Sequence, residues 1–361
     1  MAEAPLNADT TRSVESSAPS TSSSPSPTFS SAEAPSTSSV PAQGPKRPRK
    51  PRIVLEGTTD EILARNNVAA PPTFVSKLFA TAGANWNRFY SHHAATPFFK
   101  DRHWTQREWP QLASLGGEGI AGEAASGADR KGKGKAVLEV GCGTGAFIYP
   151  LLEQYPSARF CAFDFAKKAV ELTLSNPNYN PAHCHIFQHD LTAPRAVLDD
   201  KLRSAAPEFG EPILAFDFVS AVFVLSALNP NMQARAMQTL VSLLAPGGSL
   251  LFRDYALHDA AQLRFHSLPS ASYAANPSLL SNTAPLYRRG DNTLTYFFTP
   301  VEVHSLVDEA VEAINVERRE AGEAEIELEG GVDVVEREMQ NRAEAWGCTR
   351  RFVHGSWRRV R

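Results

Sequence analysis

The segment 137–145, with the sequence VLEVGCGTG, holds the residue types best suited to binding a charged small molecule. An apolar run that carries Glu139 leads into Gly141, Gly143 and Gly145. Glycines let the backbone approach a ligand closely and adopt angles that other residues resist. The N-terminus of a following helix favours negative charge. The segment therefore predicts a cofactor site on a turn between a strand and a helix.

Two cofactor classes use such a turn. Dinucleotide sites match G-x-G-x-x-G or its alanine variant, which Gly141, Gly143 and Ala146 satisfy. S-adenosylmethionine sites favour an acidic residue before G-x-G-x-G, and Glu139 supplies it. The turn alone leaves both classes open.

Two aspartates that follow later apolar runs favour S-adenosylmethionine. Asp164 ends the second run, where a carboxylate accepts both ribose hydroxyls in either cofactor class. Asp190 follows the third run, where it suits the adenine amino group as an acceptor while Leu191 packs on the ring. Each aspartate alone is equally a strand-end cap. Their order after the glycine turn nevertheless favours a methyltransferase over a nicotinamide-dependent dehydrogenase.

Short apolar runs alternate with helical patterns from residue 136 onward. The predicted strands cover 136–140, 159–163, 185–188, 216–224, 249–253, 332–339 and 351–357. Helices are predicted at 147–154, 166–174, 232–244 and 300–310, with a Pro-Gly-Gly turn at 246–248. Strands that alternate with helices form a parallel sheet covered on both faces. We therefore expect an α/β, Rossmann-like fold of the class I methyltransferase type, with a seven-stranded, mostly parallel sheet.

The composition divides the chain into four regions. Residues 1–52 are rich in Ser and Pro and end in a basic run, so we expect a disordered tail. Residues 74–112 form an aromatic segment that we expect to cap the cofactor or contact the substrate. Residues 113–135 are rich in Gly, Ala, Glu and Lys, which is typical of a flexible insert. Residues 136–361 form the predicted Rossmann-like methyltransferase domain.

The whole chain has the composition of a protein from a reducing compartment. Its 361 residues carry a formal net charge of -3, so charge alone does not mark it as a polyanion binder. Its four cysteines are widely spaced, which indicates free thiols rather than disulfides or a metal site. No apolar run is long enough to span a membrane, and no signal peptide is recognisable. We expect a cytoplasmic protein that binds no metal. The basic run at 46–52 can be a nuclear import signal, an RNA contact or a solubilising tail, and the first of these would place the protein in the nucleus as well.

Five further motifs are specific in sequence. They are FFKDRHW at 98–104, FVLSA at 223–227, LFRDY at 251–255, YRRGDNT at 287–293 and RFVHG at 351–355. Together with the glycine turn they resemble the methyltransferase-like family that makes 3-methylcytidine in tRNA. The resemblance covers about 76–112 and 136–361. The acidic stretch at 308–331 is longer than in that family, so we interpret it as a surface elaboration.

The resemblance implies an S-adenosylmethionine-dependent enzyme that acts on position 32 of the anticodon loop. It implies that Trp86 and Tyr90 close over the cofactor. The expected pocket residues are Gly141, Asp164, Asp190, Leu191 and Val222, joined by Gly143 of the glycine turn. The resemblance also implies serine or threonine tRNAs as substrates, since some members need a partner such as seryl-tRNA synthetase and others act alone on threonine tRNAs.

Methylation of cytosine at N3 needs no strong base, because N3 carries an in-plane lone pair. The enzyme mainly has to place N3 in line with the sulfonium methyl group. A carboxylate near the ring would stabilise the cationic product, and Asp254, at the end of the fifth predicted strand, is our catalytic candidate. An ion pair with a neighbouring arginine is the competing role for Asp254.

Aromatic and basic residues near the predicted site are candidates for contacting RNA. A base in a structured loop must be splayed out to be read, and Phe99 and Trp104 offer stacking surfaces unless they pack in the core. The candidates for phosphate contacts are Lys100, Arg102, His103, Arg253, Arg288, Arg289 and Arg351. For any single arginine, a solvated surface charge is the simpler interpretation.

Other functions share the same core and stay open at this point. The chain can be a methyltransferase of a protein or small molecule, or a non-catalytic partner subunit that keeps the fold. If methyl transfer depends on intact RNA, the chain is a tRNA enzyme and not a methyltransferase of a protein or small molecule. Cofactor binding without turnover would indicate a non-catalytic subunit.

Overall fold

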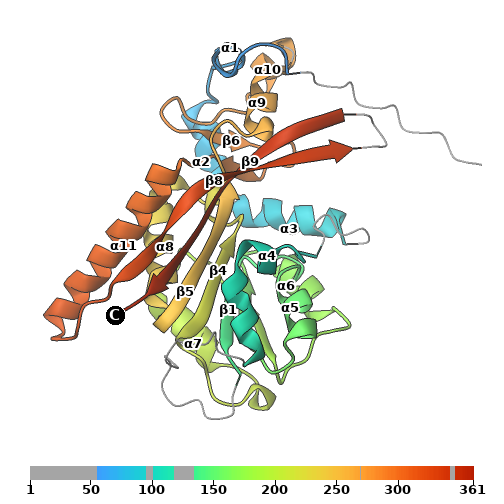
Figure 1. Cartoon of the computed structure of the whole chain (residues 1–361). Coiled ribbons are helices and arrows are strands. Elements are labelled where there is room, and N and C mark those ends of the chain that lie inside the picture. The colour runs from blue at the N-terminus through green and yellow to red at the C-terminus, as the bar shows by residue number, and fades with distance from the viewer. Residues whose placement is uncertain (1–54, 95–100, 118–133, 269, 342–345) are drawn as a thin grey trace, which may run out of the picture. The chain divides into compact units, whose positions relative to one another are not determined.

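The computed structural model describes residues 55–94, 101–117, 134–268, 270–341 and 346–361, and a seven-stranded sheet forms its centre (Figure 1). The strands are β1 (Ala136–Val140), β2 (Arg159–Asp164), β3 (Cys184–Gln188), β4 (Phe216–Val222), β5 (Leu244–Tyr255), β8 (Leu328–Asn341) and β9 (Trp346–Arg359). Their order across the sheet is β3-β2-β1-β4-β5-β9-β8. Strands β1 to β5 are parallel, and β9 pairs antiparallel with both β5 and β8. The predicted fold class is confirmed.

Strand β1 is buried along its whole length, which explains why its sequence is apolar without alternation. Successive side chains of a strand point to opposite faces of the sheet. Accordingly, Val137 packs into one hydrophobic core, whereas Leu138 and Val140 pack into another on the opposite face. Both faces of the sheet therefore need a cover of helices.

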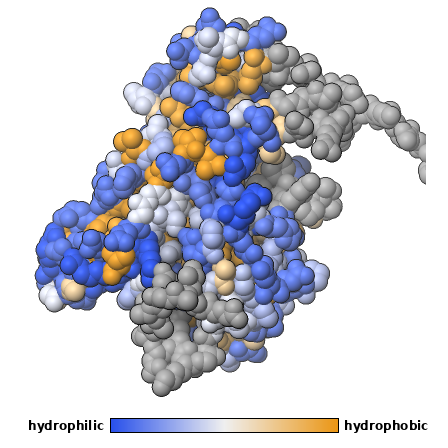
Figure 2. Space-filling model, viewed as in Figure 1, coloured by the Kyte–Doolittle hydropathy of each residue, from blue (hydrophilic) through white to orange (hydrophobic). Residues whose placement is uncertain are grey.

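Helices supply this cover on both faces (Figure 1). One face carries α7 (Arg195–Arg203), α8 (Gln233–Ser242) and α11 (Pro300–Glu320). The other face carries α5 (Ile148–Gln154), α6 (Lys167–Leu174) and the 3-10 helix η1 (Pro110–Gly116). Hydrophobic residues reach the surface along the seam between α11 and β8 (Figure 2), where Val311 and Leu328 are only partly buried.

Shorter elements complete the structure, most of them near the carboxyl ends of the parallel strands. They are α1 (Thr59–Leu63), α2 (Pro72–Ala80), α3 (Ala82–His92), α4 (Thr105–Glu108), α9 (Ala260–His266), α10 (Ser270–Ala275), the hairpin of β6 (Leu286–Arg288) and β7 (Leu294–Tyr296), and the 3-10 turns η2 (Pro207–Phe209), η3 (Leu225–Ala227) and η4 (Pro230–Met232). The buried Asn85 of α3 donates a hydrogen bond to the carbonyl of Asn292 at 3.1 Å. This bond fixes α3 against the hairpin.

Several predicted boundaries differ from the structure, and three of the differences matter for the fold. The Pro-Gly-Gly turn at 246–248 is a bulge inside β5, where Gly247 has a φ of +76° and the register with β4 shifts. Strand β4 ends at Val222 instead of 224. Helix α11 continues well past residue 310, because its inner face buries further residues such as Ile314. Much of the acidic stretch at 308–331 is therefore helix packed on the sheet and not a surface elaboration.

The other predicted regions lie partly outside the described residues. The tail at 1–52 lies outside them entirely, as do 95–100 of the aromatic segment and 118–133 of the insert. Residues 113–116, predicted to be part of that insert, belong to η1, because Leu115 is buried against the sheet. In the described part of the chain, no helix combines the length and apolarity needed to cross a bilayer.

Candidate active site

A cavity of about 200 Å³ opens at the carboxyl ends of β1, β2 and β4. Here the strand order reverses on either side of β1, which is where open α/β sheets bind their ligands. The walls come from these strand ends, from the segment after β3, and from α2 and α3. The lining residues include Phe79, Trp86, Tyr90, Gly141, Asp164, His189, Asp190, Leu191, Phe223, Val224 and Met232.

The backbone of the glycine turn requires glycine. Gly141, Gly143 and Gly145 have φ angles of +63°, +57° and +82°, a region that side chains disfavour. Neighbouring side chains also lie close. A Cβ atom on Gly141 would lie 2.7 Å from the Val224 side chain, and one on Gly143 would lie 3.0 Å from the Tyr90 hydroxyl. The turn therefore keeps the cavity open where a larger residue would fill it.

Asp164 ties the glycine turn to the start of α6. Its Oδ2 accepts the Gly143 N–H at 2.9 Å, and its Oδ1 accepts the Ala166 N–H at 2.8 Å. Burial raises the pKa of Asp164 to about 6, although these two hydrogen bonds act in the opposite direction. Asp164 thus shapes the turn and lines the cavity at the same time.

Asp190 is held beside the cavity by local hydrogen bonds. Its Oδ1 accepts the backbone N–H of Thr192 at 2.8 Å and the Thr192 hydroxyl at 2.7 Å. Its neighbour His189 also lines the cavity, and among the described residues the His189 Nε2 is buried without a hydrogen bond. Burial lowers the pKa of His189, so its ring is neutral at physiological pH. His189 was not among the predicted residues, although it directly precedes Asp190.

Helix α3 covers the glycine turn. Trp86 and Tyr90 lie one helical turn apart and both line the cavity, with ring centroids 6.0 Å from each other. Phe89 packs edge-on against both rings. Burial raises the pKa of Tyr90, so its hydroxyl is protonated where it approaches Gly143.

The half-buried Arg102 and the buried Glu139 face each other next to the glycine turn. Arg102 Nη1 is 3.5 Å from Glu139 Oε1. The backbone N–H of Arg102 donates to the Ala146 carbonyl at 2.7 Å. Burial raises the pKa of Glu139 to about 8, even though Arg102 acts to lower it. In the described part of the chain, Arg102 Nη1 and Glu139 Oε2 are buried without hydrogen bonds. Buried polar atoms are rarely left unpaired, so this pair is suited to receive a ligand with both charges.

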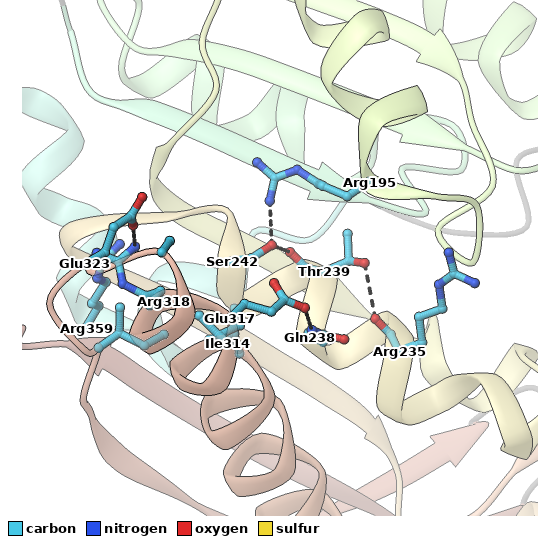
Figure 3. A pocket seen from close by; sticks show the side chains of 13 residues that line it. Arg195, Arg235, Gln238, Thr239, Ser242, Ile314, Glu317, Arg318, Glu323 and Arg359 are labelled. Carbon is cyan, nitrogen blue, oxygen red and sulfur yellow. Dashed lines mark hydrogen bonds and ion pairs between the residues drawn. The ribbon is translucent and has the colours of Figure 1, made fainter.

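A larger cavity, of about 500 Å³, lies between α8 and the C-terminal part of α11 (Figure 3). Three of its four arginines already have partners: Arg195 pairs with Asp199 at 2.8 Å, Arg318 pairs with Glu323 at 3.0 Å, and Arg359 donates to a backbone carbonyl. It contains neither the glycine turn nor the strand-end aspartates. Size alone therefore does not identify the functional cavity.

Comparisons with known proteins agree with this geometry. Residues 118–310 match a family model described as a methyltransferase domain. The chain is 37% identical over 246 residues to the tRNA N(3)-cytidine methyltransferase METTL6 of Homo sapiens, a match that covers 68% of this chain and 74% of the relative. The chain belongs to the tRNA N(3)-cytidine methyltransferase family. It is also 29% identical over 287 residues to the tRNA N(3)-methylcytidine methyltransferase trm141 of Schizosaccharomyces pombe, covering 80% of this chain and 96% of the relative. A solved SAM-dependent methyltransferase from Anabaena variabilis is 10% identical, with a TM-score of 0.43 over 77% of this chain and 94% of that one.

The residues predicted to bind the cofactor of this tRNA N(3)-cytidine methyltransferase family member lie in or beside the cavity, with one exception. Six of the eight line the cavity: Trp86, Tyr90, Gly141, Asp164, Asp190 and Leu191. Gly143 takes part through its hydrogen bond to Asp164. Val222 is buried in the sheet, and the two residues that follow it, Phe223 and Val224, line the cavity instead.

Arg253 was predicted to contact RNA, but it holds elements together. It is buried between the rings of Trp104 and Phe352, which lie 4.7 Å and 4.6 Å from its guanidinium carbon. It also pairs with Glu108 at 3.0 Å. These internal partners surround the guanidinium group, so neither Arg253 nor the ring face of Trp104 that it covers is presented to a phosphate or a base.

The other predicted RNA contacts differ in their accessibility. Arg288 is buried and donates hydrogen bonds to Asn276 and Asn292, so it also acts within the fold. Arg351 is half-buried and pairs with Glu336 at 2.7 Å. His103 is exposed, and Arg289 and Arg102 are half-buried, the latter beside Glu139. Phe99 and Lys100 lie outside the described residues.

Asp254 lies behind the cavity wall. It is fully buried. Its carboxylate accepts the backbone N–H of Ser226 and the backbone N–H of Tyr255, each at 2.9 Å. Burial raises the pKa of Asp254 to about 6. It is not among the cavity-lining residues, so it holds the segment after β4 in place rather than facing a substrate. In the described residues, no group of His, Cys, Asp and Glu side chains is arranged to hold a metal ion.

Proposed function

We propose that this protein transfers the methyl group of S-adenosylmethionine to N3 of cytidine in tRNA. Membership of the tRNA N(3)-cytidine methyltransferase family supports the reaction and the substrate. The observation that carries the proposal is the cavity, which combines Gly141 of the glycine turn with Asp164 and Asp190. The unsatisfied pair of Arg102 and Glu139 lies beside the glycine turn and adds to it.

The residues around the cavity fit S-adenosylmethionine group by group. Asp190 offers a carboxylate for the adenine amino group, with Leu191 as an apolar neighbour. Asp164 offers a carboxylate for the ribose hydroxyls. The unsatisfied Arg102 Nη1 suits the carboxylate of the methionyl end, and Glu139 Oε2 suits its ammonium group. A dinucleotide has no such zwitterionic end.

The chemistry required of the protein is mainly positioning. When bound, the cofactor supplies a methyl group on an electrophilic sulfonium. Cytosine N3 attacks through its lone pair, so no side chain has to remove a proton first. Trp86 and Tyr90 cover the cavity, exclude water and hold the reactants in place. The buried position of Asp254 agrees with a reaction that needs no base.

We further propose that the target is position 32 of the anticodon loop in serine or threonine tRNAs, with seryl-tRNA synthetase as a partner for the serine type, and that the protein acts in the cytoplasm and also in the nucleus. The tRNA position, the tRNA type and the partner rest on the resemblance of the sequence motifs to the family. The localisation rests on the composition of the chain and on the basic run at 46–52. Methylation of individually transcribed tRNAs, with and without seryl-tRNA synthetase, tests the tRNA type and the partner.

The proposal is tested by offering labelled S-adenosylmethionine together with either purified tRNA or ribonuclease-treated cell protein. We expect label in tRNA that disappears after ribonuclease digestion. Label in protein alone would replace the proposal with a protein methyltransferase. Cofactor binding by calorimetry without transfer to either pool, even after addition of cell extract, would indicate a non-catalytic subunit.

A further inference from the structure

Three aromatic rings gather where β4, β5 and β9 meet, next to the cofactor cavity. Phe223 follows β4, Tyr255 ends β5, and Phe352 lies on β9. The rings of Phe223 and Tyr255 are 4.8 Å apart and inclined by 32°, and Phe352 lies 5.6 Å and 6.2 Å from them. Phe352 is the most buried of the three, whereas Phe223 and Tyr255 are half-buried. We call these residues the aromatic cluster.

Phe223 connects the aromatic cluster to the cavity, because it also lines the cavity wall. Its backbone is strained, with a φ of +63°. The other described non-glycine residues with positive φ are two asparagines and a histidine, which tolerate this region better than a bulky aromatic residue. Such strain persists only where surrounding contacts enforce it, and it concentrates at functional sites.

The contacts that enforce this conformation can be identified. The Phe223 N–H donates to the Arg253 carbonyl at 2.8 Å, which extends the β4–β5 pairing by one residue. Three residues later, the Ser226 N–H donates to the buried carboxylate of Asp254 at 2.9 Å. Together these bonds hold Phe223 at the cavity wall and give the buried Asp254 a structural role there.

A positive charge lies beside the aromatic cluster. The Arg289 guanidinium carbon is 5.4 Å from the centre of the Tyr255 ring, and Arg289 forms no ion pair within the described part of the chain. Arg350, at 5.6 Å from the same ring, is instead fixed by the buried Asp259. Half-buried aromatic rings next to an uncommitted arginine are the elements with which proteins bind an unstacked base and its phosphate.

We propose that Phe223 and Tyr255 receive the splayed-out base of the RNA substrate, and that Arg289 contacts the adjoining phosphate. This inference rests on the proposed function and adds the site where the target nucleotide is held. Since Phe223 belongs to both the aromatic cluster and the cavity wall, a base on this cluster lies next to the methyl donor. The predicted stacking residue Trp104 does not compete for this role, because Arg253 covers its ring.

The test compares Phe223→Leu, Tyr255→Leu, Tyr255→Phe and Arg289→Gln with the unchanged protein. Tyr155→Leu is the matched control, because Tyr155 is a half-buried tyrosine at the end of α5, away from this cavity. Three quantities are measured for each: calorimetric affinity for S-adenosylmethionine, affinity for tRNA by filter binding, and kcat/KM for methyl transfer. Circular dichroism melting confirms that each variant is folded.

We expect Phe223→Leu and Tyr255→Leu to lower kcat/KM by about 5- to 100-fold, the range found when a base loses one aromatic stacking partner. Cofactor affinity should stay within about twofold for Tyr255→Leu, and Tyr255→Phe should retain activity because the ring remains. Arg289→Gln should weaken tRNA binding and reduce its salt dependence.

Full activity of folded Tyr255→Leu would overturn the inference while leaving the proposed function intact. If the unchanged protein methylates no RNA, the proposed function fails instead. The tRNA-binding measurement then still decides whether the aromatic cluster holds nucleic acid, since it needs no turnover.

Discussion

At the scale of single residues, the pair of Arg102 and Glu139 gives the most specific chemical information. Two such side chains 3.5 Å apart would normally complete each other's hydrogen bonds, yet Arg102 Nη1 and Glu139 Oε2 are buried and unsatisfied in the described part of the chain. A zwitterion between them would satisfy both. This argument is independent of the glycine turn, which two cofactor classes share.

Cofactor affinity should therefore depend on the ionisation of Glu139. Its pKa of about 8 means that a proton must leave before the carboxylate can receive an ammonium group. Affinity for S-adenosylmethionine should then fall as the pH drops below about 8, by up to about tenfold per pH unit. In Glu139→Gln, binding should be weaker and this dependence should disappear.

Calorimetric titrations of both proteins between pH 6 and 9 measure this difference. The amino group of the ligand titrates equally in both experiments, so the comparison isolates Glu139. Asp190→Asn is the control, since it should weaken binding without changing the pH dependence. Parallel pH profiles for Glu139→Gln and the unchanged protein would contradict the assignment.

Local signals in the sequence were enough to identify Gly141, Asp164 and Asp190, because a strand, a turn and a carboxylate lie within a few residues of one another. The partner of Arg102 was not recognisable, because Glu139 lies 37 positions away and meets it only in the folded chain. For the same reason the buried position of Arg288 was not predicted, because its partners Asn276 and Asn292 come from the surrounding loops. Sequence composition cannot distinguish such a buried arginine from one that faces RNA.

At the scale of secondary-structure elements, Glu108 joins three of them. It lies in α4, pairs with Arg253 of β5 at 3.0 Å and with Arg337 of β8 at 2.6 Å. Burial acts to raise the pKa of Glu108, but the hydrogen bonds and charges of Arg337 and Arg253 outweigh it and hold this pKa at about 2. The segment that carries Arg102 is thereby attached to the sheet next to the aromatic cluster.

Glu108→Ala should lower the free energy of unfolding by about 3 kcal/mol, because it leaves Arg253 buried without its counter-charge. The folded pKa of Glu108 lies below its unfolded value, so its stabilisation is full above about pH 4.5 and is lost as the pH falls towards 2. Urea unfolding at pH 7 and pH 3 measures both effects. The control is Glu171→Ala, which breaks an exposed pair with Lys168 and should change the free energy of unfolding by less than about 1 kcal/mol. Equal losses for Glu108→Ala and Glu171→Ala would contradict the structural role of Glu108.

Helix α11 gives a second test at this scale. The Thr299 hydroxyl accepts the Glu302 N–H, and the Glu302 carboxylate accepts the Thr299 N–H at 2.7 Å, which forms a capping box. Thr299→Ala should lower the free energy of unfolding by about 1 kcal/mol. Val301→Ala, at an exposed position of the same helix, is the control and should change it by less than about 0.5 kcal/mol. Unfolding curves that do not separate the two variants would show that the cap contributes nothing.

The elements themselves were predictable to different degrees. The five parallel strands are largely apolar, because both faces of the sheet are covered, and all five were found from the sequence. The full length of α11 was not predicted, because its outer face is acidic beyond residue 308 and its inner face has few buried residues there, such as Ala310 and Ile314. Helix α7 was missed for the same reason, since Leu198 and Leu202 are its only buried residues.

At the scale of the whole molecule, the functional groups converge on one edge of the sheet. The glycine turn, both strand-end aspartates, the covering helix α3 and the aromatic cluster all lie near the carboxyl ends of the parallel strands. The larger cavity elsewhere lacks the glycine turn and the strand-end aspartates, and most of its arginines are already paired, so it does not compete as the active site. One face of the molecule thus holds the donor pocket and the proposed base-binding cluster side by side.

The most direct test of the central claim is to identify the nucleoside that the protein makes. Unmodified tRNA is incubated with S-adenosylmethionine and the protein, with cell extract added in a parallel sample, and is then digested and analysed by mass spectrometry. Asp190→Ala serves as the variant with a defective donor pocket. The account predicts 3-methylcytidine with the unchanged protein and at least a tenfold loss with Asp190→Ala, on the order of one lost charged hydrogen bond. A different methylated nucleoside, or none in either sample, would contradict it.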